Sequence, residues 1–126
     1  PLRAVLVKGD EVVMTSENKI HSNFDPTHHA ELALIREFCQ KHEVMDLSAY
    51  TLYTSCEPCF MCSGSMVWAN LGRLVYSAGS RDLNEIIGEP LFDSSKVVFE
   101  LSHTKPVVKK YVLREKGIEL LEKYFG

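Results

Sequence analysis

The most informative absence in the sequence is that of a long apolar run. No stretch of its 126 residues approaches the roughly 20 consecutive apolar residues of a membrane-spanning helix, and no secretory signal is visible. Internal repeats, low-complexity tracts and a linker-like change of composition are absent as well. A chain of this length can bury one hydrophobic core but not two. We therefore expect residues 1–126 to form a single soluble domain without a membrane partner.

The sequence also lacks a large excess of either sign of charge. The chain has 14 Lys and Arg against 17 Asp and Glu, so its formal net charge is -3. This balance excludes a general attraction to nucleic acid but still allows a local basic face. A basic stretch near the C-terminus has two interpretations, a solvated helix face or an RNA contact. The stretch comprises Lys105, Lys109, Lys110, Arg114 and Lys116.

Cysteine is rare, and its distribution is uneven. Three of the four cysteines lie between residues 56 and 62. Such crowding is typical of a metal or redox site and not of a disulfide framework. We therefore expect a cytoplasmic protein. Cys39 and Cys56 are expected to be small buried apolar residues.

Apolar periodicity and turn signals predict an alternation of strands and helices. The predicted strands are 4–8, 12–15, 47–53, 74–76 and 97–101, and the first two form a hairpin. The predicted helices are 27–42, with Asp25 or Thr27 as its cap, 61–71, 83–87 and 107–124, with Gly117 a weak point in the last. Strand–helix–strand crossovers imply parallel pairing of the later strands. The order predicts an α/β fold with three α/β/α layers and a mixed sheet of about five strands.

Two segments carry side chains that suit one zinc ion. Cys59 and Cys62 lie three residues apart at the predicted start of a helix, and Pro58 suits the first helical position. The positive end of that helix favours thiolates. His29 and Glu31 lie in the first turn of the preceding helix, where side chains tilt toward the helix N-terminus. If both N-termini point at one spot, His29, Cys59 and Cys62 provide three zinc ligands and leave the fourth position open, as in catalytic sites.

The combination of His29-Ala30-Glu31 with Pro58-Cys59-Phe60-Met61-Cys62 resembles the signature of zinc nucleobase deaminases. The chain resembles the cytidine deaminase-like superfamily over nearly its whole length. The resemblance implies a Zn2+ cofactor and a hydrolytic deamination, in which an activated water attacks the ring carbon bearing the amino group and ammonia leaves. It also implies that Glu31 carries the proton, that Asn18 orients the base and that the protein is a homodimer.

Within the superfamily, the segment 25–31 is similar to the purine-acting branch, which includes guanine deaminases and tRNA adenosine deaminases. Ser55-Cys56 and Trp68 favour the guanine deaminases, whereas Leu71-Gly72-Arg73 favours the tRNA enzymes. We therefore expect a small base or nucleoside as substrate, with guanine as the leading candidate. The alternative substrate is an adenosine in tRNA.

Three further side chains are candidates for substrate contacts, and each has a structural alternative. His28 would line the mouth of the pocket, or else be a partly exposed residue at the helix start. Phe60 and Trp68 lie on the cysteine helix and would contact the base, or else belong to the core.

The cysteine segment allows three other interpretations. Cys56 could complete a closed structural zinc site with His29, Cys59 and Cys62. A strand followed by Cys-x-x-Cys and a helix also suits thiol–disulfide chemistry. Both interpretations leave Glu31 without a role. A zinc-binding module without catalysis is the alternative outside the enzymes.

Overall fold

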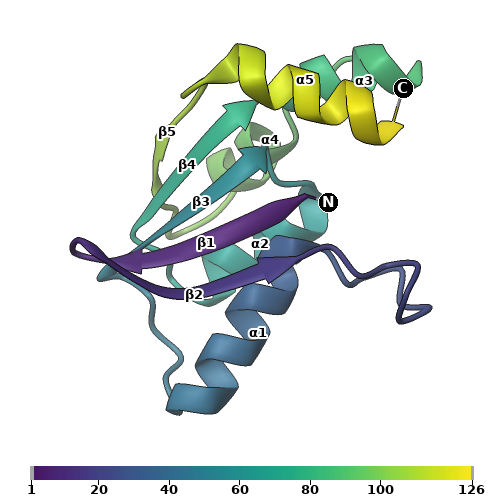
Figure 1. The fold of residues 1–126 in the computed structure, drawn as a ribbon. Helices are drawn as coiled ribbons and strands as arrows, with labels where there is room; N and C mark the ends of the chain where they lie inside the picture. The colour runs from purple at the N-terminus through teal and green to yellow at the C-terminus, as the bar shows by residue number, and fades with distance from the viewer. Residues whose placement is uncertain (1, 126) are drawn as a thin grey trace.

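The centre of the molecule is a five-stranded mixed sheet in the order β2-β1-β3-β4-β5 (Figure 1). The computed structural model describes residues 2–125. The strands are β1 (Arg3–Lys8), β2 (Glu11–Glu17), β3 (Tyr50–Cys56), β4 (Arg73–Ala78) and β5 (Val107–Lys109). β1 pairs antiparallel with β2 and with β3, whereas β3, β4 and β5 pair in parallel. The predicted hairpin and the predicted parallel strands are thus confirmed.

Five helices cover the sheet. They are α1 (Ala30–His42), α2 (Phe60–Trp68), α3 (Ser80–Ile87), α4 (Ser94–Glu100) and α5 (Arg114–Phe125). α1, α2 and α4 bury a common core against one face, whereas α5 packs with α3 on the other side, over the ends of β3 and β4 (Figure 1). The predicted α/β/α architecture is therefore confirmed. Within residues 2–125, no helix has the length and apolarity that a bilayer crossing requires.

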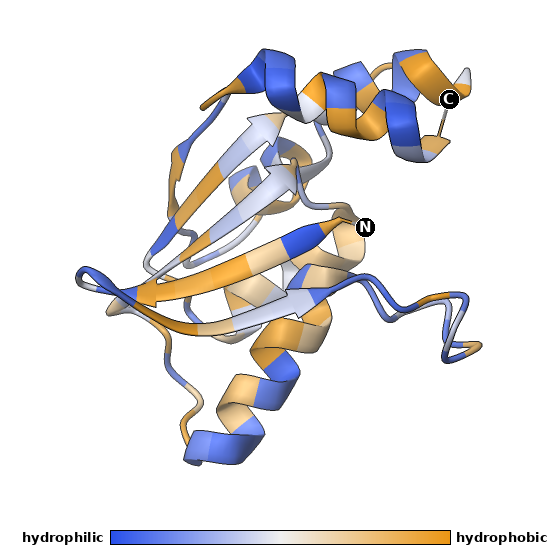
Figure 2. Ribbon diagram, in the orientation of Figure 1, coloured by the Kyte–Doolittle hydropathy of each residue, from blue (hydrophilic) through white to orange (hydrophobic). Residues whose placement is uncertain are grey.

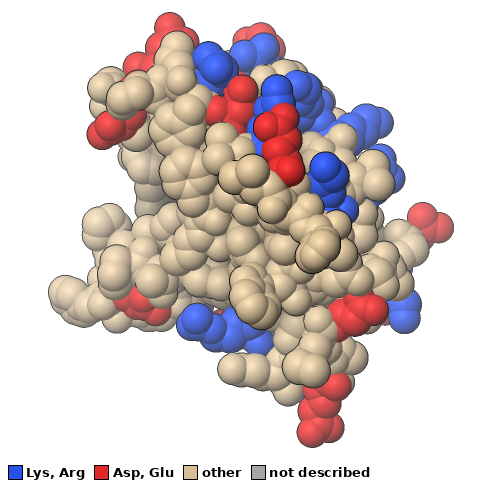
Figure 3. Space-filling model, turned by 180° about the vertical axis from the view of Figure 1, so that it is seen from behind, with Lys and Arg blue, Asp and Glu red and all other residues tan. Residues whose placement is uncertain are grey.

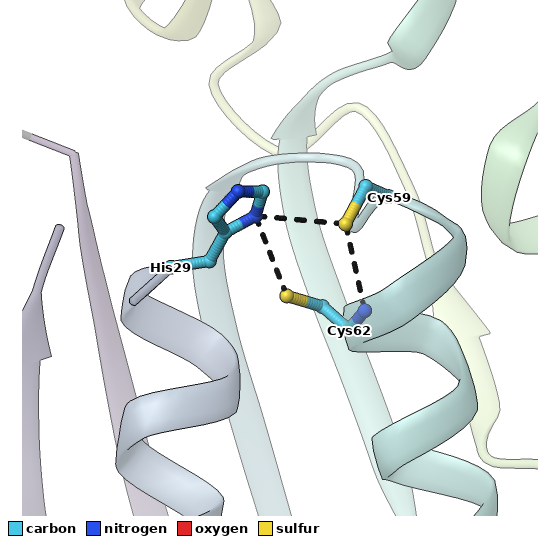
Figure 4. Close-up of side chains that lie close together, drawn as sticks. All are labelled: His29, Cys59 and Cys62. Atoms are coloured by element: carbon cyan, nitrogen blue, oxygen red, sulfur yellow. Dashed lines mark hydrogen bonds between the residues drawn. The ribbon is translucent and has the colours of Figure 1, made fainter. Parts of the chain in front are cut away.

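The main core lies between the sheet and the helices α1, α2 and α4. The middle of β1 is apolar (Figure 2), and its Ala4 and Leu6 are fully buried. Leu34 of α1 and Met66 of α2 pack against this strand layer and are fully buried too. This core fixes the N-terminal ends of α1 and α2 at the same end of the molecule (Figure 4).

The prediction of a strand at 97–101 is wrong, because residues Ser94–Glu100 form α4. Val97 and Val98 favour strands by propensity, but tertiary packing decides here. Ser95 and Phe99, four residues apart, are both buried, which is the spacing of a helix face. The fifth strand lies later in the chain, at Val107–Lys109.

The prediction of one helix over 107–124 is therefore also wrong. Its first residues pair with β4 as β5, and α5 begins only at Arg114. Gly117 is buried in α5, and a Cβ there would lie 2.8 Å from Cβ of Ser77 and 2.9 Å from the backbone nitrogen of Ala78. The glycine is thus no weak point of the helix, because it allows α5 to approach the end of β4 closely.

Several predicted boundaries shift by a few residues, including both ends of β4, the start of α3 and the end of α2. α1 begins at Ala30, because the Asp25 carboxylate accepts the backbone N–H of Thr27 at 2.9 Å and closes a turn before the helix. The third strand extends to Cys56. α2 begins at Phe60, so its N-cap is Cys59, and Pro58 precedes the helix instead of opening it.

Candidate active site

The N-caps of two helices form the centre of the candidate site. His29 is the N-cap of α1, and Cys59 is the N-cap of α2. Cys62 lies in the first turn of α2, and its backbone N–H donates to Cys59 Sγ at 3.5 Å. The imidazole and the two sulfur atoms point toward one another (Figure 4). The helices thus direct their positive ends at the three side chains, as the sequence predicts.

The spacing of the three donor atoms fits a zinc ion. His29 Nδ1 lies 3.5 Å from Cys59 Sγ and 3.7 Å from Cys62 Sγ. All three atoms lie within 4.8 Å of one another. A tetrahedral zinc with ordinary bond lengths separates nitrogen and sulfur ligands by about 3.6 Å, and two sulfurs by about 3.8 Å. The residues present therefore fit zinc, with Nδ1 as the histidine ligand atom.

Electrostatics at the site favour a bound cation. The hydrogen bond with Cys62 is the main cause that lowers the pKa of Cys59 to about 4, and the bond with His29 acts in the same direction. The hydrogen bond with Cys59 raises the pKa of Cys62, and it also raises the pKa of His29. The Cys59 sulfur is therefore a thiolate at neutral pH, which is the form that binds zinc.

Glu31 lies beside the metal ligands but outside their group. Among the described residues, the group that could hold a metal consists of His29, Cys59 and Cys62. The Glu31 side chain is half-buried and lines the adjoining cavity. Burial is the main cause that raises the pKa of Glu31 to about 7, and the charge of Cys59 adds to it. A carboxyl group with this pKa can both accept and donate a proton near neutral pH.

A cavity of about 260 Å³ lies at the carboxyl end of β3 and is lined by two of the three ligands, His29 and Cys59. Ligands of α/β proteins commonly bind at this end of the sheet. The side chains that line the cavity include Asn18, Ile20, His29, Glu31, Leu83 and Phe125.

Asn18 lies where the sequence predicts a contact to the substrate, on the wall of this cavity. Its side-chain oxygen accepts the backbone N–H of Ile20 at 3.0 Å, and its own backbone N–H donates to the carbonyl oxygen of Leu2 at 3.0 Å. The turn therefore fixes the side chain and leaves the amide NH2 as the group that can donate to a ligand.

Cys56 lines the cavity but does not join the metal ligands. Burial raises the pKa of its thiol to about 12, so the side chain stays protonated and apolar in character. The expectation that Cys56 is a small buried residue is confirmed, whereas Cys39 is only half-buried. The closed zinc site with Cys56 as fourth ligand is not formed by the described residues. All four cysteines are free of disulfide bonds, and the sulfur atoms of Cys59 and Cys62 both face His29.

The other predicted substrate contacts lie outside the cavity. His28 is half-buried in the loop before α1, and its Nδ1 lies 3.5 Å from Asn23 Nδ2. Phe60 stacks on Phe92, with ring centroids 5.2 Å apart, and lines a neighbouring cavity of about 100 Å³. Trp68 is the last residue of α2 and is 90% exposed. Trp68 is therefore not part of the core, because the end of α2 projects its side chain into solvent, and its contact to the base stays a prediction.

Sequence reasoning missed several residues of the cavity wall, among them Ile20, Ser55, Leu83 and Phe125. Ile20, Leu83 and Phe125 come from the loop after β2, from α3 and from α5. No local signal marks them, because only the tertiary fold brings these segments together. Ser55 lies at the end of β3, and the rule that ligands bind at carboxyl ends of strands could have found it. Its buried hydroxyl has no hydrogen-bond partner among residues 2–125.

Comparison with known proteins assigns this geometry to a family. The family model of the cytidine and deoxycytidylate deaminase zinc-binding region matches residues 1–78. A guanine deaminase of Bacillus subtilis is 35% identical over 112 residues, which cover 89% of this chain and 68% of that one. A tRNA-specific adenosine deaminase of Buchnera aphidicola is 30% identical over 125 residues, which cover 99% of this chain and 80% of that one.

A solved structure agrees with these relatives. The structure of guanine deaminase from Nitrosomonas europaea has a TM-score of 0.82 at 26% identity, and the match covers 98% of this chain and 72% of that one. Similarity to proteins with two different substrates leaves the choice of base open.

Proposed function

This chain belongs to the cytidine and deoxycytidylate deaminase zinc-binding family, and we propose that its substrate is a purine base, guanine in first place. Like its relatives, it is a zinc-dependent hydrolase. The observation that carries the choice of a free base is the size of the cavity, about 260 Å³. Ligand pockets commonly span roughly 300–1,000 Å³, so this cavity suits one free base better than a nucleotide.

The proposed reaction replaces an amino group by an oxygen. Zinc at His29, Cys59 and Cys62 supplies Lewis-acid activation of a water molecule when it is bound. Glu31 accepts one proton from the water and donates it to a ring nitrogen, then takes the remaining proton from the oxygen that has joined the ring carbon and passes it to the amine, which leaves as the C–N bond breaks. The base and water thereby become the oxo base and ammonia. The pKa of Glu31, about 7, suits this exchange.

Asn18 is the residue that we propose to orient the base. Its side-chain oxygen is occupied by Ile20, so the amide NH2 donates to an acceptor of the base. The apolar side chains of Ile20, Leu83 and Phe125 then cover the ring and exclude water. Phe60 and His28 are proposed to act at the mouth of the site and not on the base itself.

An adenosine in tRNA is the second candidate substrate. The tRNA-specific adenosine deaminase of Buchnera aphidicola matches this chain over 125 residues. Lys and Arg side chains also gather on one side of the molecule (Figure 3). Lys96, Lys105 and Lys110 line a cavity of about 250 Å³ beside β5. Such a surface would hold RNA phosphates.

The deciding experiment is ammonia release from a panel of guanine, adenine, cytosine, their nucleosides and a tRNA anticodon stem-loop. Glu31→Ala provides the control for each substrate. Release from guanine that the variant loses supports the proposal. Release from the stem-loop alone overturns the free base and favours the second candidate.

We also propose that the protein is a homodimer. Large apolar side chains remain exposed on and beside α2 and α4, with Trp68 90% and Leu101 87% exposed. Exposed apolar side chains of this size commonly mark interfaces. Light scattering should give the mass of a dimer for the wild type and a smaller mass for Trp68→Lys, whereas a monomeric wild type would contradict the proposal. The cytoplasmic location stays a prediction.

A further inference from the structure

Glu57 is a buried carboxylate that the proposed reaction does not use. It follows β3 directly and lies two residues before Cys59, and it is 6% exposed. A charged side chain is rarely buried to this degree unless it is paired or hydrogen-bonded. The described partners of its carboxylate are uncharged donors of Ser80 and Ser95. The carboxylate therefore has a role in joining segments of the chain.

The Glu57 carboxylate caps two helices at once. One oxygen accepts the backbone N–H of Ser80, the first residue of α3, at 3.0 Å and its hydroxyl at 3.2 Å. The other accepts the backbone N–H of Ser95, in the first turn of α4, at 3.0 Å and its hydroxyl at 2.6 Å. The N-cap residues Gly79 and Asp93 form no side-chain cap hydrogen bond. Glu57 thus accepts N-terminal N–H groups of both helices, beside Asp82, whose carboxylate accepts the N–H of Gly79 at the start of α3.

The turn that contains Glu57 and Pro58 also forms hydrogen bonds with α2, α4 and β4. The carbonyl oxygen of Pro58 accepts the hydroxyl of Ser63 in α2 at 3.2 Å and the hydroxyl of Ser94 in α4 at 2.7 Å. The backbone N–H of Glu57 donates to the carbonyl oxygen of Ala78, at the end of β4, at 2.7 Å. Cys59, the metal ligand at the N-cap of α2, follows Pro58 directly. Its position relative to the sheet is therefore set by this network.

We propose that Glu57 is a positioning residue of the metal centre. By joining α3 and α4 to the turn before Cys59, it holds the sulfur of Cys59 at its distance of 3.5 Å from His29 Nδ1. The inference rests on the proposed ligands His29, Cys59 and Cys62. Groups that orient metal ligands commonly change metal affinity by about 10- to 100-fold when they are replaced.

Glu57→Gln tests this role with almost no change of shape. A carboxylate only accepts hydrogen bonds, whereas a glutamine presents an NH2 group on one side. That group would face the donors of either Ser80 or Ser95, so one of the two helices loses its cap. The matched control is Asp82→Asn. The Asp82 carboxylate accepts the backbone N–H of Gly79 at the start of the same α3 at 2.9 Å, but it is not hydrogen-bonded to the turn before Cys59.

The measurement is the zinc dissociation constant, obtained by competition with a chromophoric chelator. We expect Glu57→Gln to weaken zinc binding by about 10- to 100-fold and Asp82→Asn to leave it close to the wild-type value. Equal affinities of Glu57→Gln and the wild type would overturn the inference while the ligand set stands. A wild type that binds no zinc would overturn the ligand set and this inference together.

A second pair of variants keeps the test valid if Glu57→Gln does not fold. Ser95→Ala removes the hydroxyl that lies 2.6 Å from the carboxylate, whereas Ser102→Ala removes one that donates to Val98 at the other end of α4. Both variants and the wild type are loaded with cobalt(II) instead of zinc, so that the visible spectrum reports the coordination geometry. We expect Ser95→Ala to change the spectrum and Ser102→Ala to preserve it. Identical spectra for both variants would contradict a positioning role.

Discussion

The two walls of the cavity are built in different ways. The metal wall consists of side chains in the first turns of two helices, namely His29, Glu31, Cys59 and Cys62. The substrate wall consists of side chains from a loop, from α3 and from α5, namely Asn18, Ile20, Leu83 and Phe125. The metal wall is polar and held by hydrogen bonds, whereas most of the substrate wall is apolar and held by packing.

This difference separates the chemistry from the choice of substrate. The metal wall requires ligand atoms at fixed distances. Two helix N-termini, and a turn before Cys59 that is held by hydrogen bonds, provide such distances. The substrate wall requires only a shape, and a shape can change with a few side chains. Relatives that act on guanine and on tRNA adenosine match the same chain, as this division predicts. Changes in the metal wall should therefore lower turnover of every substrate, and changes in the substrate wall should alter the preference among them.

The largest effect is expected from removal of a ligand. Cys62→Ser replaces a sulfur that lies 3.7 Å from His29 Nδ1 with a weaker zinc ligand. We expect the purified variant to hold little zinc and to release no measurable ammonia from any substrate. Metal analysis by plasma emission checks the first point. Cys39→Ser, on the half-buried part of α1, serves as the control and should keep both zinc and activity.

Loss of the proton carrier should be the next largest effect. Glu31→Gln keeps the shape of the side chain but cannot transfer a proton, so we expect kcat to fall by about 10²- to 10⁴-fold with zinc retained. The exposed Glu37 lies on the same helix, and Glu37→Gln should behave as wild type. Zinc-loaded Glu31→Gln with substantial activity would remove the role assigned to this residue.

A smaller effect is expected at the polar member of the substrate wall. Asn18→Ala removes the proposed hydrogen bond to the base and also the bond that holds Ile20. A neutral hydrogen bond contributes roughly 0.5–1.5 kcal/mol, so we expect KM to rise by up to about tenfold with kcat nearly unchanged. Steady-state kinetics on the preferred substrate check this split. Asn23→Ala, in the same loop but outside the cavity wall, is the control, and an equal rise there would contradict the contact.

The smallest effect is expected from the apolar side chain at the end of α5. Phe125→Ala should open the cavity and change the ratio of kcat/KM between two substrates by a few-fold, about 1 kcal/mol. The neighbouring Tyr124 packs edge-to-face against Phe125, with ring centroids 4.7 Å apart, but does not line the cavity. Tyr124→Ala should therefore leave the ratio near the wild-type value. Equal ratios in Phe125→Ala and the wild type would show that α5 does not select the substrate.

The metal wall could be predicted from the sequence because its geometry is local. Cys59 and Cys62 share the first turn of one helix, and His29 and Glu31 share the first turn of another. Short spacings of this kind determine which side chains lie together. The remaining error was small: Cys59, and not Pro58, marks the beginning of α2.

The substrate wall could not be predicted because it depends on long-range packing. The chain after residue 94 contains β-branched residues in a helix and a short strand before α5, so propensity indicated the wrong elements. The position of Phe125 follows from the close approach of α5 at Gly117 to the end of β4. The exposure of Trp68 could not be predicted for the same reason. It lies at the end of a helix, and the sequence does not reveal which segments lie beside that end.

The most direct test of the division between the walls is one ratio measured on three proteins. The ratio is kcat/KM for the preferred substrate over kcat/KM for the next best, in the wild type, in Glu31→Gln and in Phe125→Ala. We predict that Glu31→Gln lowers both constants by a similar factor and keeps the ratio within about twofold, whereas Phe125→Ala changes the ratio more than it changes the better constant. A large change of the ratio in Glu31→Gln, with none in Phe125→Ala, would contradict the account.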